Sequence, residues 1–321
     1  LKPLGSRSKR WRTGDYSDHI RAMARPSSRR MTRLALLALF TRSATAKLAQ
    51  SLGQSPWPRS FEFLVVDSDE RFHEFVAPLM EMSTIIYGAT WGSYFNSSAV
   101  NATVPGWTRG RIEANPAEGG MRALTFLQHS TGRGVVVFRG TDLDTSGVSG
   151  QADLCANAFL GGVLPPHCEE QFPAGTWDYM AQGLEFAERA TAAYPGFDFL
   201  ITGHSLGAQV GTLVGAVRGS PTLTFSSPPV APALRRLSSV EPESVGAWAE
   251  VSLYNEWDPL VSAQRGNLIG AECIWMVEPA PEGCLTCYLG GRGADMARLD
   301  CQLCWQGAHN PEGDLHLIDS R

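Results

Sequence analysis

The sequence predicts an α/β fold, in which helices cover both faces of a mostly parallel central sheet. First, short apolar segments typical of strands alternate along the chain with longer segments of helical periodicity. Second, the run Val-Val-Val-Phe at 135–138 has the continuous apolar character of a strand that is buried on both faces. Third, a turn at 203–207, bounded by two glycines, joins a predicted strand directly to a predicted helix. A chain of 321 residues can form one such domain.

The individual elements follow from local patterns. Apolar residues at helical spacing predict a first helix over 70–87. The turn-rich segment 130–134 separates two short apolar runs and therefore predicts two neighbouring strands. Pro195-Gly196 ends the next helical pattern, since both residues stop helices. After the first helix we expect strands at 123–127 and 135–138, a helix at 176–194, a strand at 197–202, a helix at 206–217, and strands at 223–225, 251–255 and 273–277.

Charge is divided unequally along the chain. Residues 1–60 contain 13 Lys and Arg against 2 Asp, whereas residues 61–321 contain 14 Arg, no Lys and 30 Asp and Glu. Such asymmetry separates a tail from a folded body, so we predict a basic leader at 1–60 and one α/β domain at 61–321. An acidic body does not favour nucleic acid or anionic membranes as partners.

The leader has the layout of a targeting segment. Met31-Thr32-Arg33 precedes the apolar stretch 34–40, and Ala44-Thr45-Ala46 follows it, as in a secretory signal peptide. The Arg- and Ser-rich, acid-poor stretch before Met31 also suits a transit peptide to a plastid or another organelle. No run of 18 apolar residues occurs, so the sequence does not predict a membrane-spanning helix. We expect a secreted protein, with organelle import as the alternative.

Cysteines and glycosylation sequons support an oxidising compartment. Sequons occur at Asn96 and Asn101. The spacing in the Cys-rich segment 284–304 fits either a four-thiolate zinc site or disulfides, and we favour disulfides in a secreted chain, with no metal and no cofactor. A bridge between Cys155 and Cys168 is also expected, and an odd cysteine then stays free. The seven cysteines are Cys155, Cys168, Cys273, Cys284, Cys287, Cys301 and Cys304.

The turn at 203–207, Gly-His-Ser-Leu-Gly, carries the predicted nucleophile. In a G-x-S-x-G elbow a strand turns sharply into a helix and holds a strained serine clear of the sheet. Glycines are needed at both ends because a side chain there would collide with the neighbouring strand and helix. The strand pattern before Ser205 and the helix pattern after it are the context that this motif requires. Ser205 is therefore the predicted nucleophile of an α/β-hydrolase fold.

A serine nucleophile needs a histidine base and a carboxylate that orients the histidine. In this fold both follow the serine, the acid first. Asp258 comes directly after the predicted strand 251–255 and is the preferred acid. Two histidines follow it, and we prefer His316 as the base, with His309 as the alternative because it precedes an Asn-Pro loop. His204 is adjacent to Ser205 but points away at an elbow, so we expect it to pack or gate.

The oxyanion formed during ester cleavage needs N–H donors placed in advance. One comes from the residue after the nucleophile, here Leu206, and the other from an earlier loop. Phe138-Arg139-Gly140-Thr141 ends an apolar strand in a glycine, and Thr141 offers both an N–H and a hydroxyl group. Thr141 and Leu206 are therefore the predicted oxyanion hole.

Four blocks of this chain resemble the class 3 lipases, which include filamentous-fungal triacylglycerol lipases. This resemblance implies the oxyanion role for Thr141, the nucleophile for Ser205 and the acid for Asp258. It also implies a lid after the oxyanion strand, where segment 142–162 lies, with an ordinary surface loop as the alternative. The chain departs from the family after its last histidine, because residues 317–320 lack the usual aromatic pair. The matching blocks are Val135 to Thr141, Ile201 to Ala208, Thr224 to Pro228, and Asn255 with Asp258 and Val261.

The expected function is hydrolysis of an acylglycerol or another lipid ester through an acyl-serine intermediate, with the substrate taken up at a lipid–water interface. One alternative is an esterase for non-lipid substrates such as phenolic esters, since the acyl pocket and not the triad decides the substrate. Another is a catalytically silent binding protein, which would apply most readily if neither His309 nor His316 reached Ser205.

Overall fold

The computed structural model describes residues 69–89, 103–113, 119–142, 144–246, 249–258, 269–275, 280, 282–289 and 298–309. All of them lie in one compact unit, Pro56–Arg321. The predicted leader at 1–60, the sequons at Asn96 and Asn101, and His316 lie outside the described residues.

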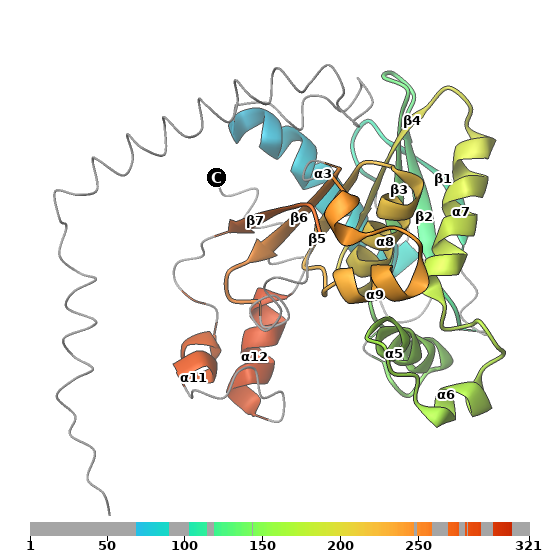
Figure 1. The fold of residues 1–321 in the computed structure, drawn as a ribbon. Helices are drawn as coiled ribbons and strands as arrows, with labels where there is room; N and C mark the ends of the chain where they lie inside the picture. The colour runs from blue at the N-terminus through green and yellow to red at the C-terminus, as the bar shows by residue number, and fades with distance from the viewer. Residues whose placement is uncertain are drawn as a thin grey trace, which may run out of the picture. The chain divides into compact units, whose positions relative to one another are not determined.

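A seven-stranded sheet forms the centre of the described part (Figure 1). The strands lie side by side in the order in which they occur along the chain. The first two pairings are antiparallel and the four that follow are parallel, which confirms the predicted mostly parallel sheet. The strands are β1 (Thr108–Glu113), β2 (Ala123–Gln128), β3 (Arg133–Phe138), β4 (Asp198–Gly203), β5 (Thr222–Phe225), β6 (Glu250–Asn255) and β7 (Ala271–Trp275).

Helices connect and cover these strands. The predicted helix at 176–194 begins only at Tyr179, because the side chain of Asp178 caps it by accepting a hydrogen bond of 3.0 Å from the Ala181 N–H. The antiparallel β1 was not predicted, and its exposed polar residues gave no strand signal. The helices are α3 (Asp69–Ala89), α5 (Val148–Leu160), α6 (Pro166–Gln171), α7 (Tyr179–Ala193), α8 (Leu206–Arg218), α9 (Ala231–Leu237), η3 (Pro242–Ser244), α11 (Cys284–Leu289) and α12 (Leu299–Ala308). None of the helices in the described part is long and apolar enough to span a membrane.

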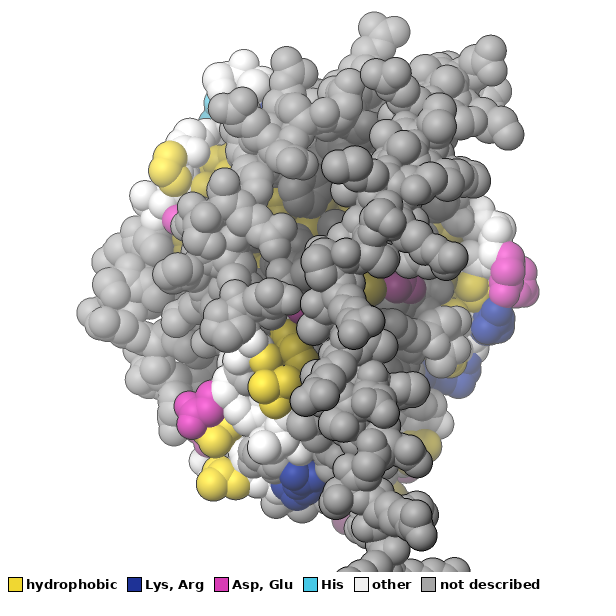
Figure 2. Space-filling model, turned by 90° about the vertical axis from the view of Figure 1, so that its left-hand side faces the viewer, with side chains coloured by type: hydrophobic (Ala, Val, Ile, Leu, Met, Phe, Trp, Pro, Cys, Tyr) yellow, Lys and Arg dark blue, Asp and Glu magenta, His cyan; other side chains and the backbone are white. Residues whose placement is uncertain are grey.

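Hydrophobic and charged side chains are mixed on the surface. Figure 2 shows one face, on which hydrophobic side chains reach the surface at several places and charged side chains stand scattered between them. Most of the large hydrophobic residues that are exposed in the described part belong to α5 and the chain after it, or to α11 and α12. These residues are Val148, Leu154, Val163, Leu285 and Leu299.

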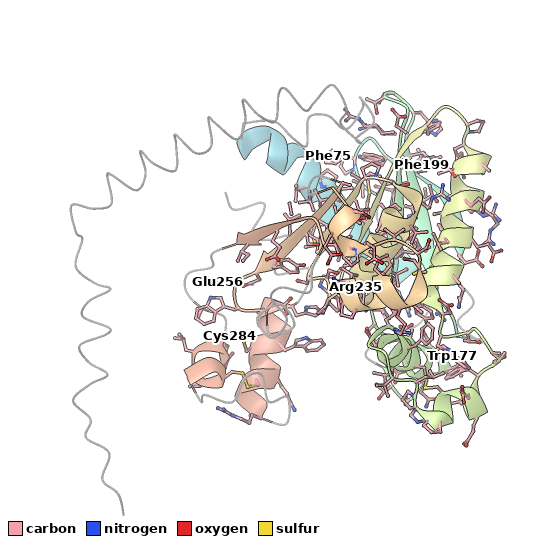
Figure 3. All side chains as sticks on the ribbon, viewed as in Figure 1. Phe75, Trp177, Phe199, Arg235, Glu256 and Cys284 are labelled. Carbon is pink, nitrogen blue, oxygen red and sulfur yellow. A yellow bond between two sulfur atoms is a disulfide. The ribbon has the colours of Figure 1, made fainter. Side chains whose placement is uncertain are left out.

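The core lies on both faces of the sheet. Alternate residues of a strand point to opposite faces, so Val136 and Phe138 of β3 pack with α7 and α8, whereas Val135 and Val137 pack with α3. Phe199 of β4 and Phe75 of α3, both labelled in Figure 3, belong to these two separate clusters. This arrangement confirms the prediction of an α/β-hydrolase fold with helices on both faces.

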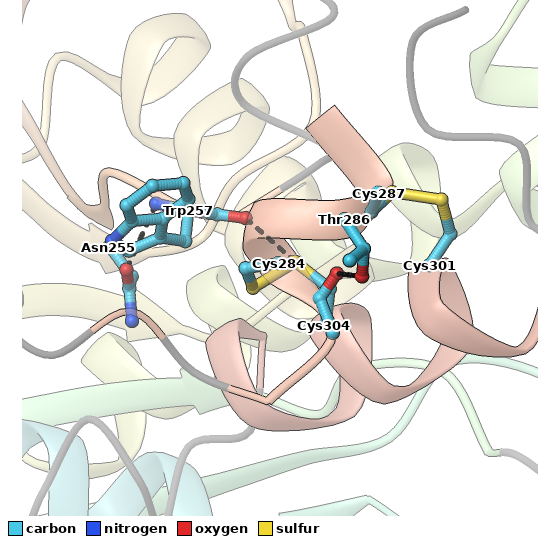
Figure 4. Close-up of a disulfide and its surroundings, with 8 residues drawn as sticks. Asn255, Trp257, Cys284, Thr286, Cys287, Cys301 and Cys304 are labelled. Atoms are coloured by element: carbon cyan, nitrogen blue, oxygen red, sulfur yellow. Dashed lines mark hydrogen bonds between the residues drawn. A yellow bond between two sulfur atoms is a disulfide. The ribbon is translucent and has the colours of Figure 1, made fainter. Parts of the chain in front are cut away.

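Three disulfides clamp two pairs of helices. Cys155–Cys168 joins α5 to α6, as expected. Cys284–Cys304 and Cys287–Cys301 join α11 to α12 (Figure 4). Because each of these four sulfur atoms is bonded to another sulfur, the alternative of a zinc site at these cysteines is wrong.

We predict that the carboxyl group of Glu250 makes stability depend on pH. Glu250 is 1% exposed at the start of β6, and burial raises its pKa well above the ordinary value, while the Thr222 hydroxyl lowers it to a smaller extent. A raised folded-state pKa contributes stability that is present below the unfolded-state pKa and is lost as pH rises through the folded-state pKa. Glu250→Gln should therefore raise the free energy of unfolding at alkaline pH and flatten its pH dependence.

Urea unfolding of the parent and the variant at a series of pH values measures this effect. Glu188→Gln changes an exposed carboxyl on α7 and serves as the control. Parallel pH curves for the parent and Glu250→Gln would contradict the prediction.

Candidate functional site

Ser205 lies at the sharp turn between β4 and α8. Its φ of 58° is positive, which among the non-glycine residues of the described part occurs only here and at Ser226. Such a backbone conformation is costly for a residue with a side chain and persists only where the surroundings enforce it. The Ser205 N–H donates to the carbonyl oxygen of Phe225 at 3.1 Å, which ties the turn to β5. The structure confirms the predicted elbow.

The two glycines of the elbow are sterically required. A Cβ atom at Gly207 would lie 2.1 Å from the carbonyl oxygen of Phe138, and one at Gly203 would lie 2.5 Å from the carbonyl oxygen of Gly207. Both distances are far below van der Waals contact, so any larger residue would push α8 away from β3. Glycine at these positions lets the helix approach the end of β3, where the predicted oxyanion loop begins.

Ser205, His309 and Asp258 form a chain of two hydrogen bonds. The Oγ atom of Ser205 is 2.9 Å from Nε2 of His309, and Nδ1 of His309 is 2.8 Å from Oδ2 of Asp258. The side chains of His309 and Asp258 are 4% and 0% exposed. This is the geometry in which a histidine can take a proton from serine while a buried carboxylate orients the imidazole ring.

This geometry corrects the preference for His316 as the base. The ring that reaches both Ser205 and Asp258 is that of His309, the alternative, and His316 lies outside the described residues. The mistake came from placing His309 in a loop. His309 instead caps the C-terminal end of α12, with its N–H donating to the carbonyl oxygen of Trp305 at 2.8 Å.

A tight turn after β6 positions the acid, as the sequence predicted. The backbone N–H of Trp257 donates to the side-chain oxygen of Asn255 at 3.0 Å, and that of Asp258 donates to the Asn255 carbonyl oxygen at 2.9 Å. The turn directs Asp258 to the carboxyl edge of the parallel strands, where the elbow also lies.

His204 and Trp305 pack against the base. The ring centroid of His309 is 5.3 Å from that of Trp305, with nearly parallel planes, and 4.7 Å from that of His204. Nδ1 of His204 lies 3.0 Å from the hydroxyl of Tyr87, so His204 packs behind the site, as predicted. Burial, and to a smaller extent the neighbouring His309, lowers the pKa of His204 well below its ordinary value. His204 is therefore neutral at physiological pH.

The loop after β3 places Thr141 next to α5. The Nδ2 group of Asn157 donates to Oγ1 of Thr141 at 2.9 Å and to the carbonyl oxygen of Asp153 at 3.0 Å. Because the hydroxyl oxygen of Thr141 accepts from Asn157, its own hydrogen is directed elsewhere. Leu206, the other predicted donor, is the first residue of α8, where backbone N–H groups point out of the helix end.

A buried polar network holds this loop. Arg139 donates to Asp153 at 2.8 Å, and both side chains are at most 3% exposed. Oδ2 of Asp153 also accepts from the backbone N–H of Asp142 at 2.8 Å, and Oδ1 accepts from the Tyr179 hydroxyl at 2.6 Å. Burial raises the pKa of Asp153, while Arg139 and these hydrogen bonds oppose the increase. Sequence reasoning missed Asn157 and this network, because no local pattern marks these polar residues as buried partners.

The segment 142–162, expected as a lid, contains α5. Its inner side is anchored by the Arg139–Asp153 ion pair and by the Cys155–Cys168 disulfide. Displacement of all of α5 would expose these buried groups. Its outer side presents Val148 and Leu154, which are 43% and 47% exposed.

Comparisons with known proteins agree with the resemblance to lipases. No family model matches the chain. A stretch of 89 residues is 38% identical to the protein named "Putative lipase ATG15" of Mycosarcoma maydis, and it covers 26% of this chain and 17% of that protein. The chain thus spans less than a fifth of the length of this relative.

Solved lipase structures are similar in fold. Lipase II from Rhizopus niveus is 14% identical with a TM-score of 0.41, over 65% of this chain and 82% of that chain. The LIP2 lipase of Yarrowia lipolytica is 15% identical with a TM-score of 0.41, over 66% of this chain and 81% of that chain.

We predict that Asn157 acts on the reaction through Thr141. Thr141→Val removes the hydroxyl donor and should lower kcat by about 100-fold, with little change in KM, as expected for loss of an oxyanion donor. Asn157→Ala should lower kcat by a smaller factor than Thr141→Val does, also with little change in KM. In the Thr141→Val background it should have almost no further effect, because the two residues would act through one hydroxyl.

Steady-state hydrolysis of a soluble ester by the two single variants and the double variant tests this coupling. Thr131→Val, an exposed threonine in the β2–β3 turn, controls for loss of a hydroxyl. A double variant whose fold-loss in kcat equals the product of the two single fold-losses would contradict the prediction.

Proposed function

We propose that this chain is a serine carboxylic-ester hydrolase that cleaves lipid esters through an acyl-serine intermediate. The observation that carries the proposal is the hydrogen-bonded chain Ser205–His309–Asp258 with Ser205 on a strained elbow. Each of the three groups has the contact that its role requires.

Acylation follows from this geometry. Nε2 of His309 takes the proton of Ser205 as Oγ attacks the ester carbonyl carbon, while Asp258 stabilises the imidazolium that forms. The carbonyl oxygen becomes an oxyanion and receives hydrogen bonds from the Leu206 N–H and from Thr141. His309 then donates its proton to the alkoxy oxygen, and the alcohol leaves.

Deacylation repeats these steps with water. His309 takes a proton from a water molecule, whose oxygen attacks the acyl-serine carbonyl. The second oxyanion occupies the same hole, and collapse returns the proton to Ser205 Oγ and releases the carboxylic acid. No cofactor takes part in this sequence of steps.

The proposed substrate is a lipid ester, taken up at a lipid–water interface. The resemblance to class 3 lipases and the name of the matched Mycosarcoma maydis protein support a lipid substrate. The exposed Val163, Leu285 and Leu299, which are 55–70% exposed, support contact with an interface. Leu285 and Leu299 lie on α11 and α12, and Val163 lies between α5 and α6. Exposed apolar side chains of this size contribute favourably when they enter a lipid phase.

The proposed location is the secretory pathway or the outside of the cell. Disulfides form and persist in oxidising compartments, and three of them clamp the described helices. They favour the signal-peptide interpretation of the leader over import into an organelle.

The two other functions receive less support. A silent binding protein was the alternative that applied most readily if no histidine reached Ser205, and the 2.9 Å between Nε2 of His309 and Oγ of Ser205 argues against it. An esterase for phenolic esters would use the same triad and differ in its acyl pocket, so a substrate series separates it from a lipase.

Hydrolysis of p-nitrophenyl and glycerol esters with short to long acyl chains, in solution and as emulsions, tests the proposal on the full chain. We expect preference for long chains in emulsions, and a loss of at least about 10³-fold in Ser205→Ala. Ser146→Ala, at an exposed serine, should retain activity. Preference for soluble phenolic esters would contradict the lipase assignment, and no turnover by the folded parent would contradict the hydrolase.

A further inference from the structure

We infer that Trp305 is a positioning residue for the base, presented to His309 by the disulfide-clamped hairpin of α11 and α12. The inference rests on the proposed function and adds to it a residue that the hydrogen-bonded triad does not include. Trp305 is half-buried in the last turn of α12, four residues before His309.

The two hydrogen bonds of His309 leave one motion of its ring unopposed. They join Nδ1 to Asp258 and Nε2 to Ser205, and so define a line across the imidazole ring. Rotation of the ring about this line tilts the Nδ1–H bond and the Nε2 lone pair out of alignment while keeping both atoms near their partners. Groups that pack on a face of the ring oppose this rotation.

Trp305 supplies such a face. Its ring is stacked on that of His309, with 5.3 Å between centroids and 20° between planes. His204, by contrast, is tilted by 45° and is itself held by Tyr87. The broad planar indole ring therefore resists tilting of the imidazole and keeps Nε2 directed at Ser205.

The hairpin holds Trp305 in place. Trp305 directly follows Cys304, which is bonded to Cys284 of α11, and one turn earlier Cys301 is bonded to Cys287. All four cysteines are fully buried, and they form one cluster with Ala308, against which Trp257 packs. The helix that ends at His309 is therefore held by its two disulfides and by the packing of Ala308 near its C-terminal end.

The same hairpin contacts the turn that carries the acid. Sγ of Cys304 lies 3.6 Å from the carbonyl oxygen of Trp257, the residue before Asp258 (Figure 4). One packed unit therefore sets the position of Trp305, of His309 and of the acid turn together.

The experiment compares Trp305→Ala, Trp305→Leu and Trp305→Phe in the full chain, with a soluble short-chain ester as substrate. We expect Trp305→Ala and Trp305→Leu to lower kcat by about ten- to hundredfold while KM changes less than about twofold, because misalignment of the base affects the chemical step. Trp305→Phe keeps a flat ring and should restore most of kcat. Thermal melting and a count of disulfides by mass spectrometry show that each variant is folded.

Gln302→Ala, at an exposed residue of α12, is the matched control and should leave kcat unchanged. An unchanged kcat in Trp305→Ala would overturn the inference. So would a Trp305→Leu variant as active as Trp305→Phe, since the side chain would then only fill space. An inactive parent would overturn the proposed function itself, which distinguishes that failure from a failure of the inference.

Discussion

The close approach of α8 to the end of β3 is the constraint on which the site depends. A Cβ atom on residue 207 would lie 2.1 Å from the Phe138 carbonyl oxygen, so only glycine fits, and the helix can begin directly beside the oxyanion loop. The same approach forces Ser205 into its positive φ, which the hydrogen bond to Phe225 maintains. Backbone packing thus brings the proposed nucleophile, Ser205, and the start of α8 to the end of β3. Rigid backbone elements of this kind hold reacting groups with the precision that catalysis needs.

One ion pair and three disulfides hold the helices that complete the site. On one side, the ion pair between Arg139 and Asp153 joins the oxyanion loop to α5, and a disulfide joins α5 to α6. On the other side, two disulfides join α11 to α12, which ends at His309. In the proposed mechanism the parallel strands supply the nucleophile and the acid, whereas the base and Thr141 depend on these clamped helix pairs. Disulfides favour the ordered arrangement by restricting the unfolded chain.

The sequence was sufficient to predict those features that depend on local residue patterns. Strong apolar runs predicted β3 and β4, and the glycines around Ser205 predicted the elbow. The turn after β6 also placed Asp258 correctly, because parallel strands end at one edge of the sheet. The choice between His309 and His316 was wrong because the Asn-Pro sequence after His309 hid the helix before it. A helix at 299–308 could have been found from Cys301 and Cys304, which lie three residues apart and both face the core. Asn157 and Trp305 could not be predicted, since their roles depend on contacts between elements far apart in the chain.

Labelling of Ser205 can show directly which histidine is the base. The measurement is the rate at which a fluorophosphonate labels the parent, His309→Ala and His316→Ala, with the modified residue located by mass spectrometry. The account predicts a single adduct on Ser205, slowed by at least about 10³-fold in His309→Ala and unchanged in His316→Ala. Rapid labelling of Ser205 in His309→Ala, with the loss found instead in His316→Ala, would contradict it.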